Sequence, residues 1–190
     1  VCPYLWGDDT AFDWMEIWNG PMRPANARAL TWWTQLLRLG RKIPIVGGSD
    51  YHKGRFPVRL GQPVTAVYSP SPDSQDLLKA LAAGHAYVTS GRTGTRLSLT
   101  CGDYMMGDTI PCGNHIELTA EASFSPLEKL ILVSGRGERE LSCRDGKIQV
   151  AISAQEGFAY LKTVPRAGKS GFFTAVTNPL YFHLTEANTG

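Results

Sequence analysis

The chain has 190 residues, 43% of them hydrophobic, and its 19 basic and 17 acidic side chains give a formal net charge of +2. This length and composition allow a sizeable core in one large domain or two small ones. The near balance of charge, without a basic block, predicts no nucleic-acid partner, and the lack of an apolar run of roughly 20 residues predicts no membrane-spanning segment.

The four cysteines show no C-x-x-C spacing, so they predict neither a zinc knuckle nor a dense disulfide framework. Cys101 and Cys112 flank a turn-rich segment and could pair with each other. Free thiols in a reducing compartment are the favoured interpretation, which predicts a cytoplasmic protein. No charged and apolar leader follows Val1, although the true N-terminus could lie upstream of it.

The first predicted element is a strand over residues 12–18, where aromatic and polar residues alternate up to the turn signal Asn19-Gly20-Pro21. Glu16 stands among bulky apolar residues near the carboxyl end of this strand. Such a carboxylate must be paired, be hydrogen-bonded or face a polar cavity. An ordinary charge at an exposed edge is the other interpretation.

Residues 24–39 have the apolar spacing of an amphipathic helix, with Pro24 suited to its first turn and Gly40 suited to its C-terminal cap. The short apolar run 43–46 then predicts a second strand. Strand, helix and strand with short connections form a βαβ unit, which implies that the two strands are parallel.

The second strand ends at Gly47-Gly48-Ser49-Asp50-Tyr51-His52, a turn that leads into a Gly/Arg/Pro-rich loop. Asp50 and His52 are two residues apart, so at the end of an extended segment they project the same way. A carboxylate and an imidazole together suit Zn, Mn or Fe, which bind both oxygen and nitrogen ligands. The alternative interpretation is an Asx-turn followed by a solvated histidine.

A further strand is predicted over residues 63–68, followed by a helix that opens at Ser71-Pro72-Asp73 and ends at Gly84, and by a short strand over 86–89. His85 follows the end of this helix. We expect its side chain to interact with the last carbonyls of the helix and not to bind a metal.

The pattern changes after residue 91, where short alternating runs are separated by turn signals. The predicted strands cover residues 95–100, 115–121, 127–134, 147–153, 158–164 and 172–176. Their even spacing predicts an antiparallel β-sandwich over residues 92–190, after an α/β domain over residues 1–91. The aromatic residues of the last strands could form a ligand-binding face, but alternation favours core positions. They are Phe158, Tyr160, Phe172 and Phe173.

Taken together, these segments resemble the C-terminal half of a PHP domain, the metal-dependent phosphoesterase family named for polymerase and histidinol phosphatase, in the subgroup that appends a β-sandwich. The segments that carry the resemblance are Glu16-Ile17-Trp18-Asn19-Gly20, the helix with Trp33, the Gly47–His52 turn, Gly61-Gln62-Pro63-Val64-Thr65, Gly84 to Gly91, and Thr177-Asn178-Pro179. The fold implied is the C-terminal part of a (β/α)7 barrel, an α/β structure, followed by the all-β sandwich.

The resemblance also implies a cluster of divalent metal ions (Zn, Mn or Fe) at the carboxyl ends of the barrel strands. Asp50 and His52 would be metal ligands and catalytic residues, and Glu16 and Asn19 would line the pocket or support the ligands. The guanidinium groups of Arg55 and Arg59 would hold a substrate phosphate, unless they are ordinary solvated loop charges.

The other ligand motifs of the family, His-x-His, Asp-His and His-Pro, have no counterpart here; Cys2-Pro3 could align with His-Pro, or that motif lies upstream of Val1. A metal ion that activates water needs three or more protein ligands. The chain is therefore predicted to be a fragment of a hydrolase of small-molecule phosphate esters or other esters, inactive alone. The alternative is a non-catalytic remnant whose sandwich binds a ligand or partner.

A lone strand–helix–strand unit would also leave an exposed sheet edge, which needs a cover. A second copy of the chain, in a homo-oligomer, would supply it, and so would a missing N-terminal piece.

Overall fold

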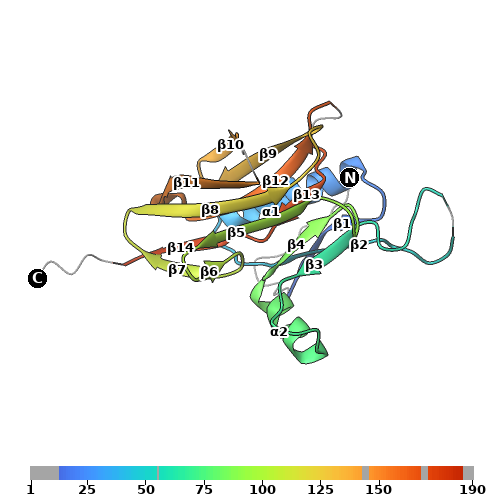
Figure 1. Cartoon of the computed structure of the whole chain (residues 1–190), viewed down its shortest axis with the longest axis horizontal. Coiled ribbons are helices and arrows are strands. Elements are labelled where there is room, and N and C mark those ends of the chain that lie inside the picture. The colour runs from blue at the N-terminus through green and yellow to red at the C-terminus, as the bar shows by residue number, and fades with distance from the viewer. Residues whose placement is uncertain (1–12, 55, 143–145, 168–170, 186–190) are drawn as a thin grey trace, which may run out of the picture.

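Figure 1 shows the computed structural model of the chain, which describes residues 13–54, 56–142, 146–167 and 171–185. Within these ranges the chain forms fourteen β-strands, two α-helices and one short 3-10 helix. The strands lie in a two-stranded, an eight-stranded and a four-stranded sheet. The two larger sheets pack face to face, and the first helix covers the outer face of the eight-stranded sheet.

The two-stranded sheet contains β1 (Met15–Asn19) and β2 (Ile45–Gly48), which run parallel. The helix α1 (Pro24–Arg38) connects them. Pro24 occupies its first turn, and Gly40, with a φ of 78°, takes the left-handed position that ends it. The predicted strand–helix–strand unit with parallel strands is confirmed.

The eight-stranded sheet has the order β10, β9, β12, β13, β4 and β3, with β14 pairing to β12 and β7 pairing to β14. Every pair is antiparallel except β14 with β7. The bounds, in chain order from β3, are Val64–Val67 (β3), Ala86–Thr89 (β4), Thr109–Cys112 (β7), Glu128–Ser134 (β9), Gly137–Leu141 (β10), Phe158–Pro165 (β12), Ala175–Thr177 (β13) and Leu180–Leu184 (β14).

One sheet thus joins strands from both sides of the predicted boundary at residue 91. The strand β4 precedes that boundary, and its antiparallel neighbour β13 lies far beyond it, with Val88 opposite Val176. The division into domains 1–91 and 92–190 stays a prediction.

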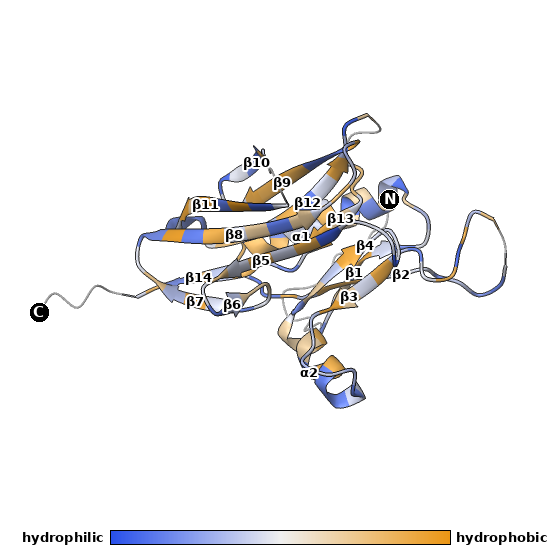
Figure 2. Ribbon diagram, in the orientation of Figure 1, coloured by the Kyte–Doolittle hydropathy of each residue, from blue (hydrophilic) through white to orange (hydrophobic). Residues whose placement is uncertain are grey.

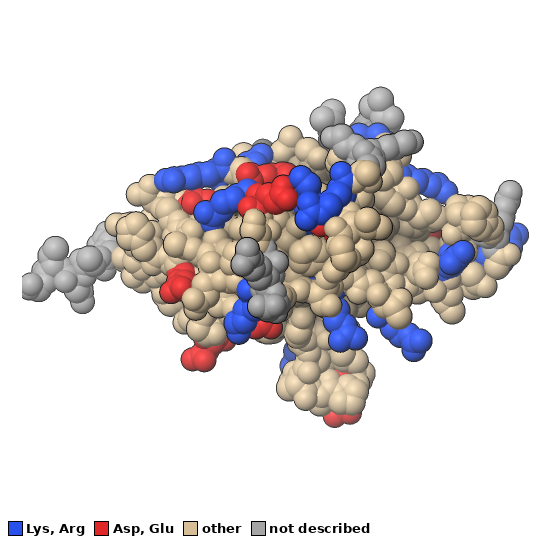
Figure 3. Space-filling view, turned by 45° about the horizontal axis from the view of Figure 1, so that its top comes forward, with Lys and Arg blue, Asp and Glu red and all other residues tan. Residues whose placement is uncertain are grey.

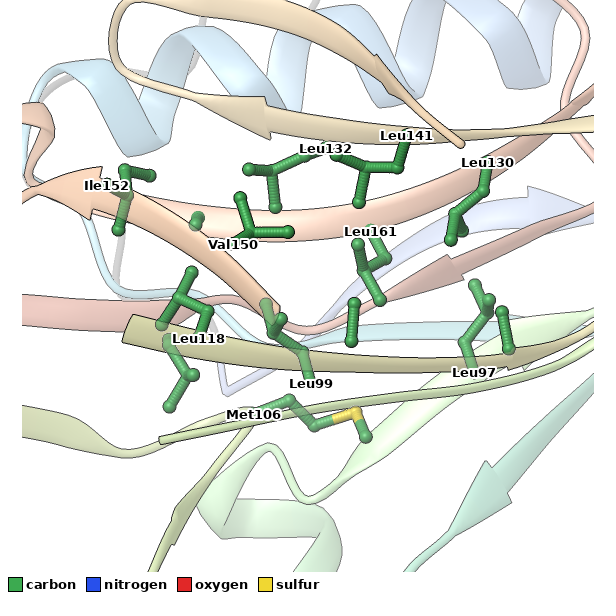
Figure 4. Close-up of a cluster of buried hydrophobic side chains, with 14 of the residues drawn as sticks. Leu97, Leu99, Met106, Leu118, Leu130, Leu132, Leu141, Val150, Ile152 and Leu161 are labelled. Carbon is green, nitrogen blue, oxygen red and sulfur yellow. The ribbon is translucent and has the colours of Figure 1, made fainter. Parts of the chain in front are cut away.

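The four-stranded sheet is antiparallel, in the order β11 (Lys147–Ser153), β8 (His115–Ser123), β5 (Arg96–Cys101) and β6 (Tyr104–Met105). Hydrophobic and hydrophilic residues alternate along β8, so that one face of the strand is buried (Figure 2). The main core lies between this sheet and the larger one. Its side chains converge in Figure 4, among them Leu97, Leu99, Leu118, Leu130, Val150 and Leu161.

The strand β12 divides its side chains between two cores. Ala159 and Leu161 face the core between the sheets, whereas Phe158 and Tyr160 face a second core beneath α1. There the Trp33 and Tyr160 rings lie 5.0 Å apart, a distance at which aromatic side chains attract each other. Phe158, Tyr160 and Phe173 are therefore core residues, as the alternation predicted, and Phe172 is half-buried.

The predicted barrel segment, and with it a TIM-like barrel, is wrong. A (β/α)7 barrel alternates strands with helices, whereas the described residues form two α-helices against fourteen strands. Only α1 connects parallel neighbours in the described part of the chain. The second helix, α2 (Ser74–Ala83), connects β3 to β4, which are antiparallel neighbours in the eight-stranded sheet. The fold is mostly β.

Two side chains explain why no further parallel strand follows β2. Thr65 Oγ1 accepts a hydrogen bond from the Gly47 N–H and donates one to the Gly47 carbonyl, each at 2.9 Å. The buried Asn178 accepts from the Ile45 N–H at 2.8 Å and donates to the Ala86 carbonyl at 3.0 Å. These side chains satisfy backbone groups of β2 that another strand would otherwise pair with.

The start of α2 also differs from the prediction. Asp73 is its N-cap, and Ser71 lies outside the helix, where its Oγ donates to the Asp76 carboxylate at 2.7 Å. Cys101 and Cys112 are free thiols. Neither α-helix of the described residues is long and apolar enough to cross a membrane.

Candidate functional site

Asp50 and His52 lie just beyond the carboxyl end of β2, and their side chains meet. His52 Nε2 lies 3.0 Å from Asp50 Oδ1, with the imidazole side chain 82% exposed and the carboxylate side chain 49% exposed. Asp50 has a φ of 51°, the only positive φ of a non-glycine residue among the described residues. Aspartate tolerates this left-handed conformation better than most residues, but at a cost in backbone strain. The turn after β2 is therefore bent where its two candidate ligands converge.

Glu16 and Asn19 form a second polar pair at the end of β1. Asn19 Nδ2 donates to Glu16 Oε2 at 3.1 Å, and both side chains are exposed. Residues three apart on a regular strand point to opposite faces. Here the register with β2 shifts between Glu16 and Trp18, and this irregularity lets Asn19 reach back to Glu16. Glu16 was expected to be either a hydrogen-bonded carboxylate or an ordinary exposed charge, and it is both hydrogen-bonded and exposed.

The two pairs share one edge because β1 and β2 are parallel, with Asn19 opposite Gly48. The Gly20 N–H donates to the Gly48 carbonyl at 2.9 Å. A Cβ added at Gly20 would lie 3.8 Å from the Asp50 Cβ, and one added at Gly48 would lie 3.2 Å from Glu16 Oε1. The turn after β1 and the turn after β2 are therefore in contact, and this edge carries two carboxylates and one imidazole.

These residues do not form a complete metal site. Among the described residues, no group of three or more His, Cys, Asp or Glu side chains is placed to hold a metal ion. Glu16 stays with Asn19 and does not join Asp50 and His52. The divalent-metal site therefore stays a prediction, with Asp50 and His52 as its two candidate ligands at this edge.

The predicted phosphate-binding arginines contribute less. Arg55 lies outside the described residues. Arg59 is exposed and forms a backbone bridge with Gln62, whose N–H donates to the Arg59 carbonyl at 3.2 Å. The loop that carries it extends away from the body of the molecule, on the right of Figure 1. In the described part of this loop no hydrogen bond or ion pair joins Arg59 to Asp50 or His52.

The sequence did not predict a second histidine–aspartate pair. His85 Nε2 lies 2.9 Å from Asp108 Oδ1, and the Met105 N–H donates to Asp108 Oδ2 at 2.8 Å. We had expected the His85 side chain to interact with the carbonyls of α2, but it pairs with a carboxylate instead. Only the backbone N–H of His85 donates to a carbonyl of α2, that of Ala80. The two residues are 23 apart in sequence, and no local motif links them.

Comparison of the chain with family models, with curated protein sequences and with solved structures finds no match.

Proposed function

We propose that the chain is part of a metal-dependent hydrolase of small-molecule phosphate esters, in which Asp50 and His52 supply two ligands of a divalent-metal site. The observation that supports this proposal is the approach of Asp50 Oδ1 to His52 Nε2, 3.0 Å apart, beyond the carboxyl ends of two parallel strands. In open α/β structures, ligands bind at that edge.

The donor atoms fit a zinc-like ion. Two ligand atoms about 2.0–2.1 Å from a tetrahedral metal ion lie about 3.3 Å from each other. The distance of 3.0 Å between Oδ1 and Nε2 is close to that separation. Both side chains are more exposed than those of the His85–Asp108 pair, and the second carboxylate oxygen of Asp50 has no hydrogen-bond partner among the described residues. This oxygen is thus available to a further ligand.

A divalent ion at this position would lower the pKa of a bound water and so supply hydroxide at neutral pH. The residues of the chain would bind this ion and the substrate. Asp50 and His52 would bind the ion, and Glu16, held by its hydrogen bond from Asn19, would line the same edge of the two strands. The exposed guanidinium of Arg59 would be available to a substrate phosphate. Two ligands are too few for such a centre. We therefore expect the chain to require at least one more from outside the described residues, and to be inactive alone.

Titration with Co²⁺, followed by its visible absorption, and calorimetry with Zn²⁺ test the proposal. We expect Asp50→Asn and His52→Gln each to weaken metal binding at least roughly tenfold, which corresponds to about 1.4 kcal/mol. His115→Gln is the matched control, because His115 is an exposed histidine on β8. Equal metal affinity in all four proteins, or an equal loss in the control variant, would refute the proposed ligands.

A further inference from the structure

A cavity of about 540 Å³ lies on another part of the molecule, between the C-terminal end of α1, the β9–β10 turn, β14 and the 3-10 helix η1 (Ala154–Glu156). Its volume is within the range of pockets that bind small molecules, roughly 300–1,000 Å³. Because α1 begins at the carboxyl end of β1 and returns to the amino end of β2, its C-terminal end lies opposite the edge that carries Asp50 and His52. Within the described ranges, none of the residues predicted for the metal site lines this cavity, whereas Phe158, one of the aromatic residues considered for a ligand-binding face, does.

The floor of the cavity is apolar and aromatic. It includes Leu37, Phe158 and Tyr181, which are all buried. Burial raises the pKa of the Tyr181 hydroxyl well above its usual value, so this group stays neutral and able to donate. The described residues provide no hydrogen-bond partner for this hydroxyl. The floor therefore suits a planar or apolar body and leaves one donor unused.

The rim of the cavity is cationic. Arg38, Lys42 and Arg136 line it, and in the described part of the chain none of them forms an ion pair with a carboxylate. Lys42 Nζ lies 5.1 Å from the centre of the Tyr181 ring and donates to Thr109 Oγ1 at 2.7 Å. These contacts hold the ammonium group at the cavity but do not neutralise it.

One carboxylate, that of Glu156, also lines the cavity, and it is already hydrogen-bonded within the chain. Ser134 Oγ donates to one of its oxygens, and the Ser153 N–H donates to the other at 3.3 Å. The three cations and this carboxylate leave a net charge of +2 on the lining.

The exposed surface of β9, β10 and β12 differs in this respect. There Lys129 pairs with Glu140 at 2.9 Å, and Lys162 pairs with Glu138 at 2.6 Å. Figure 3 shows acidic side chains flanked by basic ones on this face. Among the residues that the structure describes, the cationic side chains at the cavity therefore have no carboxylate partner, whereas Lys129 and Lys162 of the neighbouring sheet surface each have one.

The backbone around the cavity is held in place by its own contacts. The Gly135 N–H donates to the Glu156 carbonyl at 3.2 Å, which joins the β9–β10 turn to η1. Ser153 and Glu156 form a capping box at the start of η1. The Phe182 N–H donates to the Gly157 carbonyl at 2.9 Å, which joins η1 to β14. The β9–β10 turn, which carries Arg136, is therefore joined to η1 and β14, and these three segments form one wall of the cavity.

We propose that this cavity binds a small organic anion, with a carboxylate or phosphate group at the rim and an aromatic or apolar body on the floor. Arginine and lysine form charge-assisted hydrogen bonds with both kinds of anion, and the apolar floor favours burial of the attached body. This inference does not depend on the proposed hydrolase function, since the cavity shares no residue with the Asp50–His52 edge.

The test is a titration of the 190-residue chain, followed by amide NMR shifts and calorimetry, with phenyl phosphate, benzoate, benzyl alcohol and inorganic phosphate as probes. We expect phenyl phosphate or benzoate to bind more tightly than the neutral alcohol and the bare phosphate, and to shift the amides of Gly135, Gly157 and Phe182. The stronger of the two aromatic anions identifies the preferred head group.

Variants locate the binding site. Arg38→Gln and Arg136→Gln should each weaken binding of the stronger anion roughly fivefold to tenfold, because each removes a charged donor. Arg28→Gln, on the same helix but ten residues or about 15 Å from Arg38, should leave it unchanged. Asp50→Asn should also leave it unchanged, which separates this proposal from the hydrolase proposal. Unchanged anion binding in Arg38→Gln and Arg136→Gln, equal binding of benzyl alcohol, or no binding of either aromatic anion would overturn the inference.

Discussion

Two histidine–aspartate pairs in this molecule have nearly the same length and very different surroundings. The nitrogen–oxygen distance is 3.0 Å between His52 and Asp50 and 2.9 Å between His85 and Asp108. In the first pair the side chains are 82% and 49% exposed, and in the second they are 26% and 31% exposed. The second oxygen of Asp108 accepts a backbone hydrogen bond, from Met105. The half-buried pair thus uses its hydrogen-bonding capacity to connect elements of the fold, and the exposed pair leaves capacity for a ligand.

The backbone brings the two pairs together in different ways. The residues that precede His85 and Asp108 are Gly84 and Gly107. These two glycines are in close contact, because a Cβ added at Gly84 would lie 3.1 Å from the Gly107 Cα. Asp50 reaches His52 by a left-handed turn within one loop. One pair depends on long-range packing and the other on local conformation, so substitutions can distinguish them.

The largest expected effect is that of Gly107→Ala. A methyl group there would overlap the Ala83 carbonyl, and Gly107 also has a φ of 103°, which alanine rarely adopts. We expect the free energy of unfolding to fall by about 3 kcal/mol or more, measured by urea denaturation. The control is Gly54→Ala in the Asp50 loop, where the nearest atom to an added Cβ is the Tyr51 hydroxyl at 3.4 Å. A cost for Gly107→Ala no greater than for Gly54→Ala would mean that this packing contact does not hold the pair.

A smaller effect is expected from removing each histidine. His85→Ala should lower the free energy of unfolding by about 1–2 kcal/mol, because Asp108, half-buried, loses a hydrogen-bond partner. His52→Ala should change it by less than about 0.5 kcal/mol, since that side chain is 82% exposed. Both values come from the same denaturation experiment. Equal costs for the two variants would contradict the division into a structural pair and a free pair.

Local structure could be predicted from the sequence to a large extent. The spacing of apolar residues, Pro24 and Gly40 located α1 to within one residue of its end. Short apolar and alternating runs located β5, β8, β9, β11 and β12. Of these strands, β5, β8 and β11 have one face on the main core, whereas β9 and β12 contribute side chains to both cores. Shorter strands such as β7, β10 and β14 carry too little of this pattern and were not predicted.

The arrangement of these elements could not be predicted, since it depends on pairs far apart in sequence. Local pattern predicted the β1–α1–β2 unit, and its extension into a barrel was an expectation that rested on the resemblance to a PHP domain. Instead, β4 pairs with β13, and Asn178 forms hydrogen bonds with Ile45 and Ala86. No local sequence pattern predicts these contacts. Because of these contacts, the strands β3 and β4 that follow β2 belong to a mostly antiparallel sheet.

The site divides in the same way. Asp50 and His52 could be paired from their spacing of two residues. The contact between Glu16 and Asn19 depends on a shift in strand register, and the contact between His85 and Asp108 spans 23 residues. The cationic cavity combines residues of α1, the β9–β10 turn and η1. Glu16 and Asn19 were grouped only through the resemblance to a PHP domain, and neither the His85–Asp108 pair nor the cavity has a sequence motif.

A small gain in stability, expected in Asp50→Gly, tests whether the exposed pair is held at a cost to stability. Glycine adopts a φ of 51° without strain, whereas aspartate does so with a penalty. We expect Asp50→Gly to raise the free energy of unfolding by up to about 0.5 kcal/mol, measured by urea denaturation, because relief of the strain exceeds the entropy that glycine adds to the unfolded chain. We also expect it to remove metal binding in the Co²⁺ titration. A gain in stability with a loss of binding is typical of a position that is kept for function.

The matched control for this substitution is His52→Gly, because His52 lies in the same loop and does not have a positive φ. Glycine there should leave stability unchanged or lower it slightly, since it only adds conformational freedom to the unfolded chain, while metal binding is lost as well. If Asp50→Gly were as stable as or less stable than the original chain, the left-handed turn would carry no strain. Asp50 would then be an ordinary loop residue, and the two pairs would differ in exposure alone.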